Sequence, residues 1–205
     1  GGLQDWGSWW TNSPDPMATW TFPSTGDGSF CAVTDGGGSY YYSRQSGRVM
    51  RALLDNNGNV TAFRRIDPIG AKKDNYMFIA PFILDPVDNN VMYLTEGENL
   101  WRNDALNQVN LDGSWDTITT GWFKYSFSLT DTLSDITALA CSKNNVAHRL
   151  YFGTDKKKIY KMENANSGDP VPVEITGSGM PASGYVSSIA VDPRNADKLM
   201  VVFSN

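Results

Sequence analysis

The chain has 205 residues, enough for one large domain or two small ones with a sizeable buried core. Its 17 lysine and arginine residues against 22 aspartate and glutamate residues give a net charge of −5, and the scattered basic residues exclude the basic stripe of a nucleic-acid or anionic-membrane surface. Only 19% of residues are charged, whereas glycine and aromatic residues are plentiful, a composition typical of turn-rich all-β proteins.

A hairpin pattern recurs along the chain. Four apolar runs begin 51 to 57 residues apart, at 29–35, 80–85, 137–142 and 188–192. After a short turn of Asn, Asp or Gly, each is followed by a second strand-like run, at 40–43, 91–95, 150–154 and 199–203. Each pair of runs predicts a β-hairpin.

Two more strands follow the first three hairpins. Third strands are predicted at 48–53, 100–102 and 158–162, and fourth strands, after a polar loop, at 59–65, 114–119 and 171–175. Four antiparallel strands with a period of about 50 residues are typical of a propeller blade. The sequence therefore predicts an all-β fold, a partial β-propeller of four-stranded antiparallel blades with about four blade equivalents.

The two ends of the chain fit the same pattern as incomplete blades. Residues 1–3 match the end of a second strand, with a third strand at 8–11 and a fourth at 18–22, and the last strands, 186–191 and 199–203, match a first and a second. The expected divisions of this single propeller are a half blade 1–25, blades 26–70, 71–121 and 122–177, and a half blade 178–205. An unpaired edge invites association, so we expect 8–11 to pair with 199–203, within one chain or between two copies; alternatively, the chain is part of a longer propeller.

Short motifs at 1–9, 26–28, 82–86 with 91–93, and 189–193 with 195–197 resemble secreted bacterial propellers of the neuraminidase-repeat and sortilin-like superfamily, especially large extracellular proteins with C-terminal sorting domains. The resemblance implies a secreted or cell-surface location. It says little about activity, because one propeller fold supports many functions. The Asp-box turns of that superfamily are degenerate here, and we expect Asp and Asn in the turns, including Asp85 and Asp192, to shape the backbone.

One face of such a propeller collects the turns between second and third strands and the connections between blades. Paired carboxylates are what glycoside hydrolysis requires, and Asp5 and Asp27 are the candidate catalytic pair if the protein is a hydrolase. The alternative for both is turn geometry or ligand binding. Trp6, Trp9, Trp10 and Trp20 could stack on sugar rings. The candidate ligand-binding residues are Gln4, Trp6, Arg44, Arg48, Glu96, Trp122 and Tyr125.

Cysteine and histidine are scarce. Cys31 and Cys141 lie on first strands with a blade between them, which predicts two free, mostly buried thiols. The single histidine, His148, is expected in a surface turn, and neither a metal site nor a cofactor is predicted. The longest apolar run, 76–84, is far shorter than the roughly 20 residues that span a membrane.

We therefore expect a binding or scaffold module for a carbohydrate or protein ligand, without chemistry of its own. A second copy, or further blades of a longer chain, would be its partners. A carbohydrate-active glycoside hydrolase is the alternative function.

Overall fold

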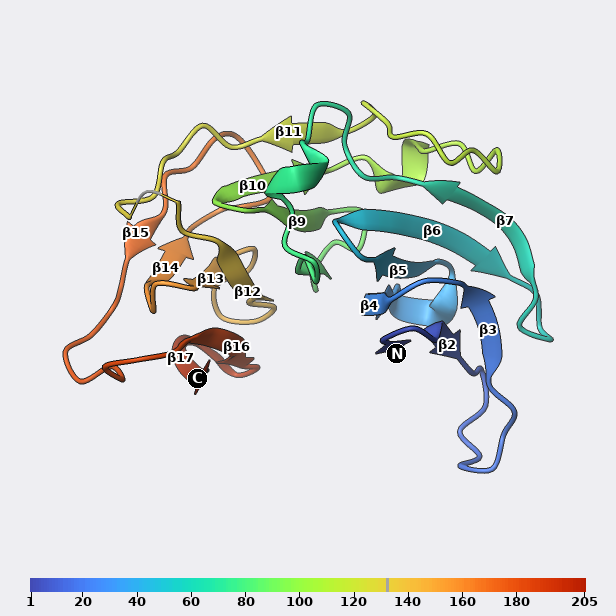
Figure 1. Ribbon diagram of the computed structural model, residues 1–205, viewed down its shortest axis with the longest axis horizontal. Helices are drawn as coiled ribbons and strands as arrows, with labels where there is room; N and C mark the ends of the chain where they lie inside the picture. The colour runs from blue at the N-terminus through green and yellow to red at the C-terminus, as the bar shows by residue number, and fades with distance from the viewer. Residues whose placement is uncertain (132) are drawn as a thin grey trace. The chain divides into compact units, whose positions relative to one another are not determined.

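The computed structural model describes residues 1–131 and 133–205, and regular structure in this part of the chain is almost entirely β (Figure 1). The strands form antiparallel sheets in chain order, three of them four-stranded, which confirms the predicted fold class. Three short 3-10 helices interrupt the loops: η1 (Asp35–Gly37), η2 (Lys73–Asn75) and η3 (Leu106–Gln108). None of the helices in the described residues has the length and apolarity needed to cross a membrane.

The chain divides into two compact units. Gly1–Ala80 with Asn107–Thr120 make the first unit, and Pro81–Leu106 with Gly121–Asn205 make the second. The first unit begins with a sheet of β1 (Gly2–Leu3), β2 (Gly7–Trp10) and β3 (Thr21–Ser24). The β3 strand begins three residues later than the sequence predicts.

The central strand of this sheet is β2. It pairs with β1 on one side and with β3 on the other, and the Trp9 N–H also donates to the Gly1 carbonyl at 2.9 Å. The expectation that residues 8–11 pair with 199–203, within one chain or between two copies, is therefore wrong. The reason is that residues 1–3 fold back and occupy that edge.

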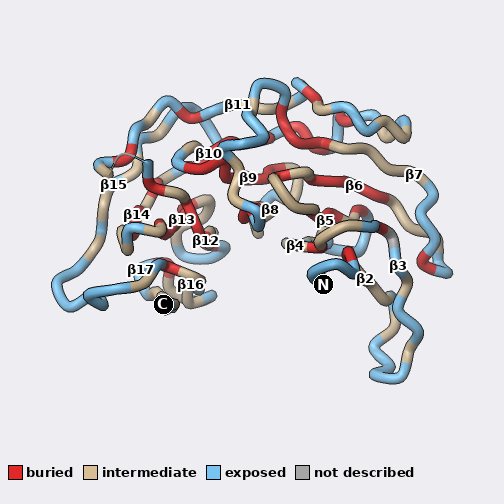
Figure 2. The backbone as a smooth tube through the Cα atoms, in the orientation of Figure 1, coloured by how far each residue is buried: buried red, intermediate tan, exposed pale blue. Residues whose placement is uncertain are grey.

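The complete sheet of the first unit runs from β4 (Gly28–Val33) through β5 (Tyr40–Arg44) and β6 (Arg48–Leu54) to β7 (Val60–Arg65), close to the predicted bounds. Tyr42, Met50 and Ala52 are buried and form one apolar cluster of this sheet, against which Phe63 packs. The buried residues of this sheet lie mainly on β5 and β6, whereas no residue of β7 is fully buried (Figure 2).

The outer edge of β7 is covered by residues 107–120. The Gly113 N–H donates to the Phe63 carbonyl, and the Arg65 N–H to the Ser114 carbonyl, at 2.9 and 3.0 Å. Pro68 and Ile118 form a parallel bridge further along. The prediction of 114–119 as the fourth strand of the blade at 71–121 is therefore wrong, because this extended run bonds to the preceding sheet.

The second unit contains the other two four-stranded sheets. The first runs through β8 (Phe82–Leu84), β9 (Met92–Glu96), β10 (Asn99–Asn103) and β11 (Trp122–Lys124), the last of which takes the place predicted for 114–119. The second runs through β12 (Ile136–Cys141), β13 (Leu150–Thr154), β14 (Ile159–Met162) and β15 (Val173–Glu174). Every residue of β9 and β13 is buried, as expected of strands covered on both faces (Figure 2).

The core of this unit lies between these two sheets. Tyr93 and Leu100 from one sheet meet Ile136, Phe152 and Tyr160 from the other. The Phe152 and Tyr160 rings stack with centroids 5.0 Å apart. The last sheet, β16 (Tyr185–Asp192) and β17 (Asn195–Ser204), packs on the opposite face of β12 to β14.

A tight turn at Ser46 and Gly47 joins β5 to β6. Both residues have positive φ, 59° and 70°, and a side chain at position 47 would place its Cβ 2.1 Å from the Tyr76 ring. Gly36 has a similar φ of 79° but has open space around it. Position 47 therefore requires glycine for two reasons, whereas position 36 requires it for one.

We predict that Gly47→Ala lowers the free energy of unfolding by about 2 kcal/mol more than Gly36→Ala, because only the first adds a steric clash to the left-handed strain. Urea denaturation followed by tryptophan fluorescence measures both variants. Equal losses would show that Tyr76 moves aside at no cost.

Candidate functional site

The two candidate catalytic aspartates lie together, but in a turn arrangement. The Asp5 N–H donates to Asp27 Oδ1 at 2.8 Å, and Asp5 itself has a φ of 61°. The Asp27 N–H in turn donates to the Gln45 side-chain oxygen at 3.2 Å. The Asp27 carboxylate thus stabilises the turn that contains Gln4, Asp5 and Trp6, all three of which are exposed.

The arginines predicted for this face also lie in the first unit. Arg44 and Arg48 stand opposite each other in the β5–β6 ladder. The Arg44 guanidinium lies against Gly26, and a Cβ added to Gly26 would be 2.7 Å from Arg44 Nη2. The Arg44 Cζ atom also lies over the Trp115 ring, 5.7 Å from its centroid. Stacked on an aromatic ring, Arg44 is partly committed to packing.

The other three predicted ligand-binding residues belong to the second unit, where they are buried or half-buried. Glu96 is buried, and its Oε2 accepts a hydrogen bond from Trp101 Nε1 at 2.8 Å. Trp122 is half-buried on β11, opposite Asn103. Tyr125 is buried and donates to the Ala165 carbonyl, and burial raises the pKa of its phenol to about 12. Glu96 and Tyr125 are thus not open to a ligand.

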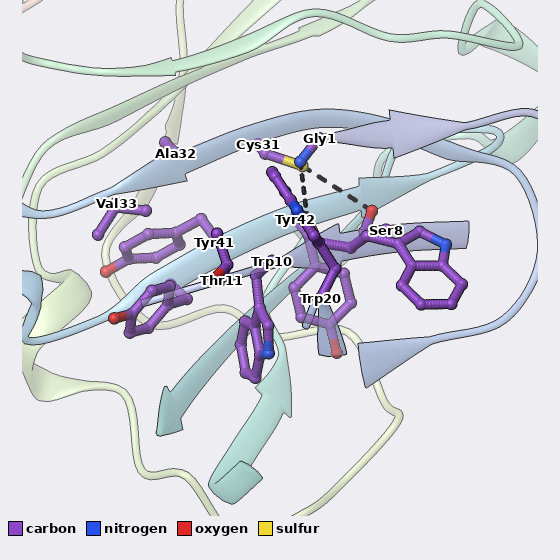
Figure 3. A pocket seen from close by; sticks show the side chains of 12 residues that line it. Gly1, Ser8, Trp10, Thr11, Trp20, Cys31, Ala32, Val33, Tyr41 and Tyr42 are labelled. Carbon is purple, nitrogen blue, oxygen red and sulfur yellow. Dashed lines mark hydrogen bonds between the residues drawn. The ribbon is translucent and has the colours of Figure 1, made fainter. Parts of the chain in front are cut away.

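An aromatic pocket of about 190 Å³ lies between β2, β4 and β5 of the first unit (Figure 3). Its lining residues come from the first residue, from three short stretches and from the loop before β3: Gly1, Ser8–Thr11, Cys31–Val33, Tyr40–Tyr42 and Trp20. The Trp10 and Tyr40 rings meet edge to face, with centroids 5.2 Å apart. Figure 3 shows Trp10 and Trp20 beside the β5 tyrosines.

The surface next to this pocket is a shallower hollow of about 470 Å³ lined by Gly1, Gly2, Leu3, Trp9 and Trp20. Trp20 is 50% exposed, and nearby Trp6 is 67% exposed. Trp9 is held in place by its ring contact with Phe22, at 5.1 Å between centroids, and by a 2.7 Å hydrogen bond from its Nε1 to the Trp6 carbonyl. The aromatic pocket and this hollow form one ring-lined surface, which we call the tryptophan surface.

Sequence reasoning noted these tryptophans but missed Tyr40–Tyr42 and the Cys31 strand as their neighbours. Three tyrosines in succession on a strand place one ring on the opposite face from the other two, and that signal was available. The pairing of residues 1–3 with 8–11, which brings Gly1 to the pocket, agrees with the second and third strands predicted there.

A second cluster of reactive residue types surrounds Asp85 in the second unit. Asp85 Oδ2 receives Tyr93 Oη at 3.1 Å, His148 Nδ1 at 2.9 Å and Cys141 Sγ at 3.5 Å. Its Oδ1 accepts the N–H groups of residues 87 and 88, which confirms the predicted turn-forming role of Asp85. Burial, reinforced by the Asp85 charge, raises the pKa of the Cys141 thiol well above its usual range. This thiol is held protonated, unlike a nucleophile.

The prediction for the two cysteines is partly wrong. Both are free, as expected, but Cys31 is exposed and Cys141 is half-buried. His148 does lie in a turn, with a φ of 58°, and it also bonds to the buried Asp85. No cluster of three or more metal-ligating side chains occurs in the described part of the chain.

The fold, though not the function, has a counterpart among solved proteins. No family model matches the sequence, and no curated protein matches it either. Of 45 solved chains that are similar, one is the Dos1 propeller, with a TM-score of 0.53 and 8% identity. The alignment covers 90% of this chain and 41% of that one.

These findings define the class of the protein as an all-β propeller with antiparallel four-stranded blades. The chain spans about two fifths of the length of the Dos1 propeller chain. The propeller fold is compatible with a binding or scaffold module.

We predict that iodoacetamide labels Cys31 rapidly and Cys141 slowly in the folded protein at pH 8, because the thiolate is the reactive form and Cys141 is kept from forming it. Mass spectrometry of the native chain and of Cys31→Ser measures this. Rapid labelling of Cys31→Ser would contradict the arrangement around Asp85.

We predict that Asp85→Ala lowers the free energy of unfolding by about 3 kcal/mol, because the buried Tyr93 hydroxyl and four less buried donors lose their shared acceptor. Asp88→Ala, three residues away in the same turn but exposed, is the matched control and should cost about 1 kcal/mol or less. Chemical denaturation measures both. Equal small losses would mean that water replaces the carboxylate.

Proposed function

We propose that the protein is a non-catalytic carbohydrate-binding module and that its ligand lies on the tryptophan surface of the first unit. The observation that carries this proposal is the Trp20 ring, which is 50% exposed and lines both the pocket and the hollow. Trp6, 67% exposed, lines neither, but its carbonyl accepts the Trp9 Nε1 hydrogen bond at the margin of this surface. Large exposed aromatic rings grouped on one surface indicate an interaction site. The compatibility of the propeller fold with binding modules supports the same conclusion.

The chemistry of this surface suits a sugar. The apolar C–H face of a pyranose ring can stack on an indole ring, which gives contact area at little entropic cost because the ring has two rotatable angles. The Gln4 and Asp5 side chains are exposed beside Trp6 and can hydrogen-bond to hydroxyl groups at the rim. Apolar faces at the centre and polar groups at the edge match the two kinds of surface on an oligosaccharide.

Binding is favoured over hydrolysis because the Asp27 carboxylate already hydrogen-bonds to the backbone of Asp5. A hydrolase needs two carboxyl groups free to act on opposite sides of a glycosidic bond. Asp27 instead accepts the Asp5 N–H and stabilises the turn between β1 and β2. The resemblance to secreted propellers supports a location outside the cell or on its surface, where polysaccharides are accessible ligands.

The test begins with a glycan array and continues with calorimetry on the best oligosaccharide it finds. We predict that Trp6→Ala and Trp20→Ala each weaken binding about 5- to 30-fold, the effect of losing about 1 to 2 kcal/mol of ring stacking. The same oligosaccharide should slow the labelling of Cys31, which lines the pocket.

Trp115→Ala is the matched control, since Trp115 is about as exposed as Trp20 but packs on Phe63 outside this surface. It should leave the affinity unchanged. An array without signal, or equal losses in all three variants, would contradict the proposal. Release of reducing sugar that disappears in Asp27→Asn would favour the hydrolase instead.

A further inference from the structure

Arg44 and Arg48 differ from the other arginines of the chain. Six of the eight arginines donate a side-chain hydrogen bond to another residue: Arg51, Arg64, Arg65, Arg102, Arg149 and Arg194. In the part of the chain that the structure describes, Arg44 and Arg48 have neither a hydrogen-bond acceptor nor a carboxylate partner, and Arg44 Nε is buried without an acceptor. A buried donor without an acceptor is rare and costly, so this pair is suited to a group from outside the chain.

The two guanidinium groups belong to one short stretch of sheet. Arg44 and Arg48 are directly opposed in the β5–β6 ladder, next to the turn that joins the two strands. Opposed residues project from the same face of an antiparallel pair, with Cβ atoms about 5 Å apart, and like charges in this position destabilise it. Both side chains are half-buried, on the two central strands of the β4–β7 sheet. A negative group between them would remove the repulsion and supply the missing acceptor.

The surroundings of Arg44 hold its guanidinium in one place. The group packs on the Trp115 ring and against Gly26, whose φ of 88° belongs to the left-handed region. A Cβ at position 26 would be 2.7 Å from Arg44 Nη2 and 3.0 Å from Nε, so glycine is needed for this close approach. The neighbouring Gln45 side-chain oxygen accepts the Asp27 N–H. A planar donor group that is already fixed loses little freedom when it binds an anion.

We propose that Arg44 and Arg48 bind one doubly charged oxyanion, the phosphate or sulfate group of a ligand. Each guanidinium can donate two parallel hydrogen bonds to such a group, and its two negative charges match the two positive charges of the pair. A carboxylate would leave one of the arginines uncompensated. The net charge of the chain is −5, so attraction of an anion depends on this pair rather than on the protein as a whole.

This oxyanion site is separate from the carbohydrate site proposed above. Neither arginine lines the aromatic pocket or the hollow beside it. The proposal therefore goes beyond the proposed function, and either can fail without the other.

Calorimetry on the full chain at pH 8 and constant ionic strength tests the site, with inorganic phosphate and sulfate as probes and acetate as the singly charged comparison. We expect phosphate and sulfate to bind, and Arg44→Gln and Arg48→Gln each to raise the dissociation constant at least about tenfold. Arg64→Gln is the matched control, because it removes the same charge from the same sheet but from an arginine bonded to Asp112. It should leave the affinity unchanged.

Urea denaturation separates a binding role from a structural one. Without phosphate, Arg48→Gln should raise the denaturation midpoint, because it removes the repulsion between the two arginines. Phosphate should raise the midpoint of the parent chain and leave that of Arg48→Gln unchanged. A lower midpoint for Arg48→Gln in the absence of phosphate would indicate that the charge stabilises the fold, contrary to the proposal.

Two tryptophan variants distinguish this site from the tryptophan surface. Trp115→Ala should weaken phosphate binding, because it removes the ring on which Arg44 packs, whereas Trp20→Ala should not.

Glucose 6-phosphate identifies the source of the anion. Tighter binding than that of inorganic phosphate would support a phosphate ester as the ligand, and equal binding would support the free ion. Failure of phosphate, sulfate and glucose 6-phosphate to bind would overturn the proposal. So would acetate binding as tight as that of phosphate, or phosphate binding that survives both Arg44→Gln and Arg48→Gln.

Discussion

A single carboxylate, that of Asp85, gathers groups from four separate parts of the second unit. The turn after β8, the Tyr93 hydroxyl on β9, the Cys141 thiol on β12 and the His148 ring before β13 all bond to it. A buried charge is costly unless its lone pairs are satisfied, and here five donors share the two oxygens. Two adjacent sheets are thereby joined by hydrogen bonds beside the apolar core between them, to which Tyr93 also belongs.

The first unit also contains a buried carboxylate, that of Asp67, but its donors, the Val49 N–H and the Arg65 guanidinium, both belong to one sheet. Between its two sheets the first unit uses aromatic packing instead. Trp9, Trp10 and the β5 tyrosines fill the space between its two sheets only in part, and the remainder is the aromatic pocket. The difference has a functional meaning: a site closed by hydrogen-bonded charge has little room for a ligand, whereas a site lined by partly exposed rings can accept one. The Asp85 cluster therefore has a structural arrangement, although it contains the residue types usually associated with chemistry, and the tryptophan surface is the site proposed for binding.

Much of the fold could be predicted from the sequence, because apolar runs with a period of two and glycine or Asx turns carry local information about hairpins. The bounds of β5, β6, β9 and β13 agree with prediction to within one residue. Residues 114–119 show where sequence-based prediction fails. An extended run does not indicate which strand it will pair with, and here it bonds to β7 of the preceding sheet. For the site, Trp6, Asp5 and Asp27 were brought together as expected. Tyr125 was misplaced because its burial depends on Ala165, which is distant in sequence. Glu96 was misplaced although its partner Trp101 lies in the same hairpin, because the hairpin pattern does not show that the turn is buried.

The excursion of residues 107–120 has a consequence for biosynthesis. These residues belong to the first unit but follow the first three strands of the second, so the chain leaves the first unit at Ala80 and returns to it before continuing. During synthesis, the edge of β7 therefore remains uncovered until some 40 further residues have been made. Neither unit could be obtained whole by removing one end of the chain. Any nascent-chain chaperone that protects this protein would have its strongest reason to bind during that interval, with β7 as the strand it shields.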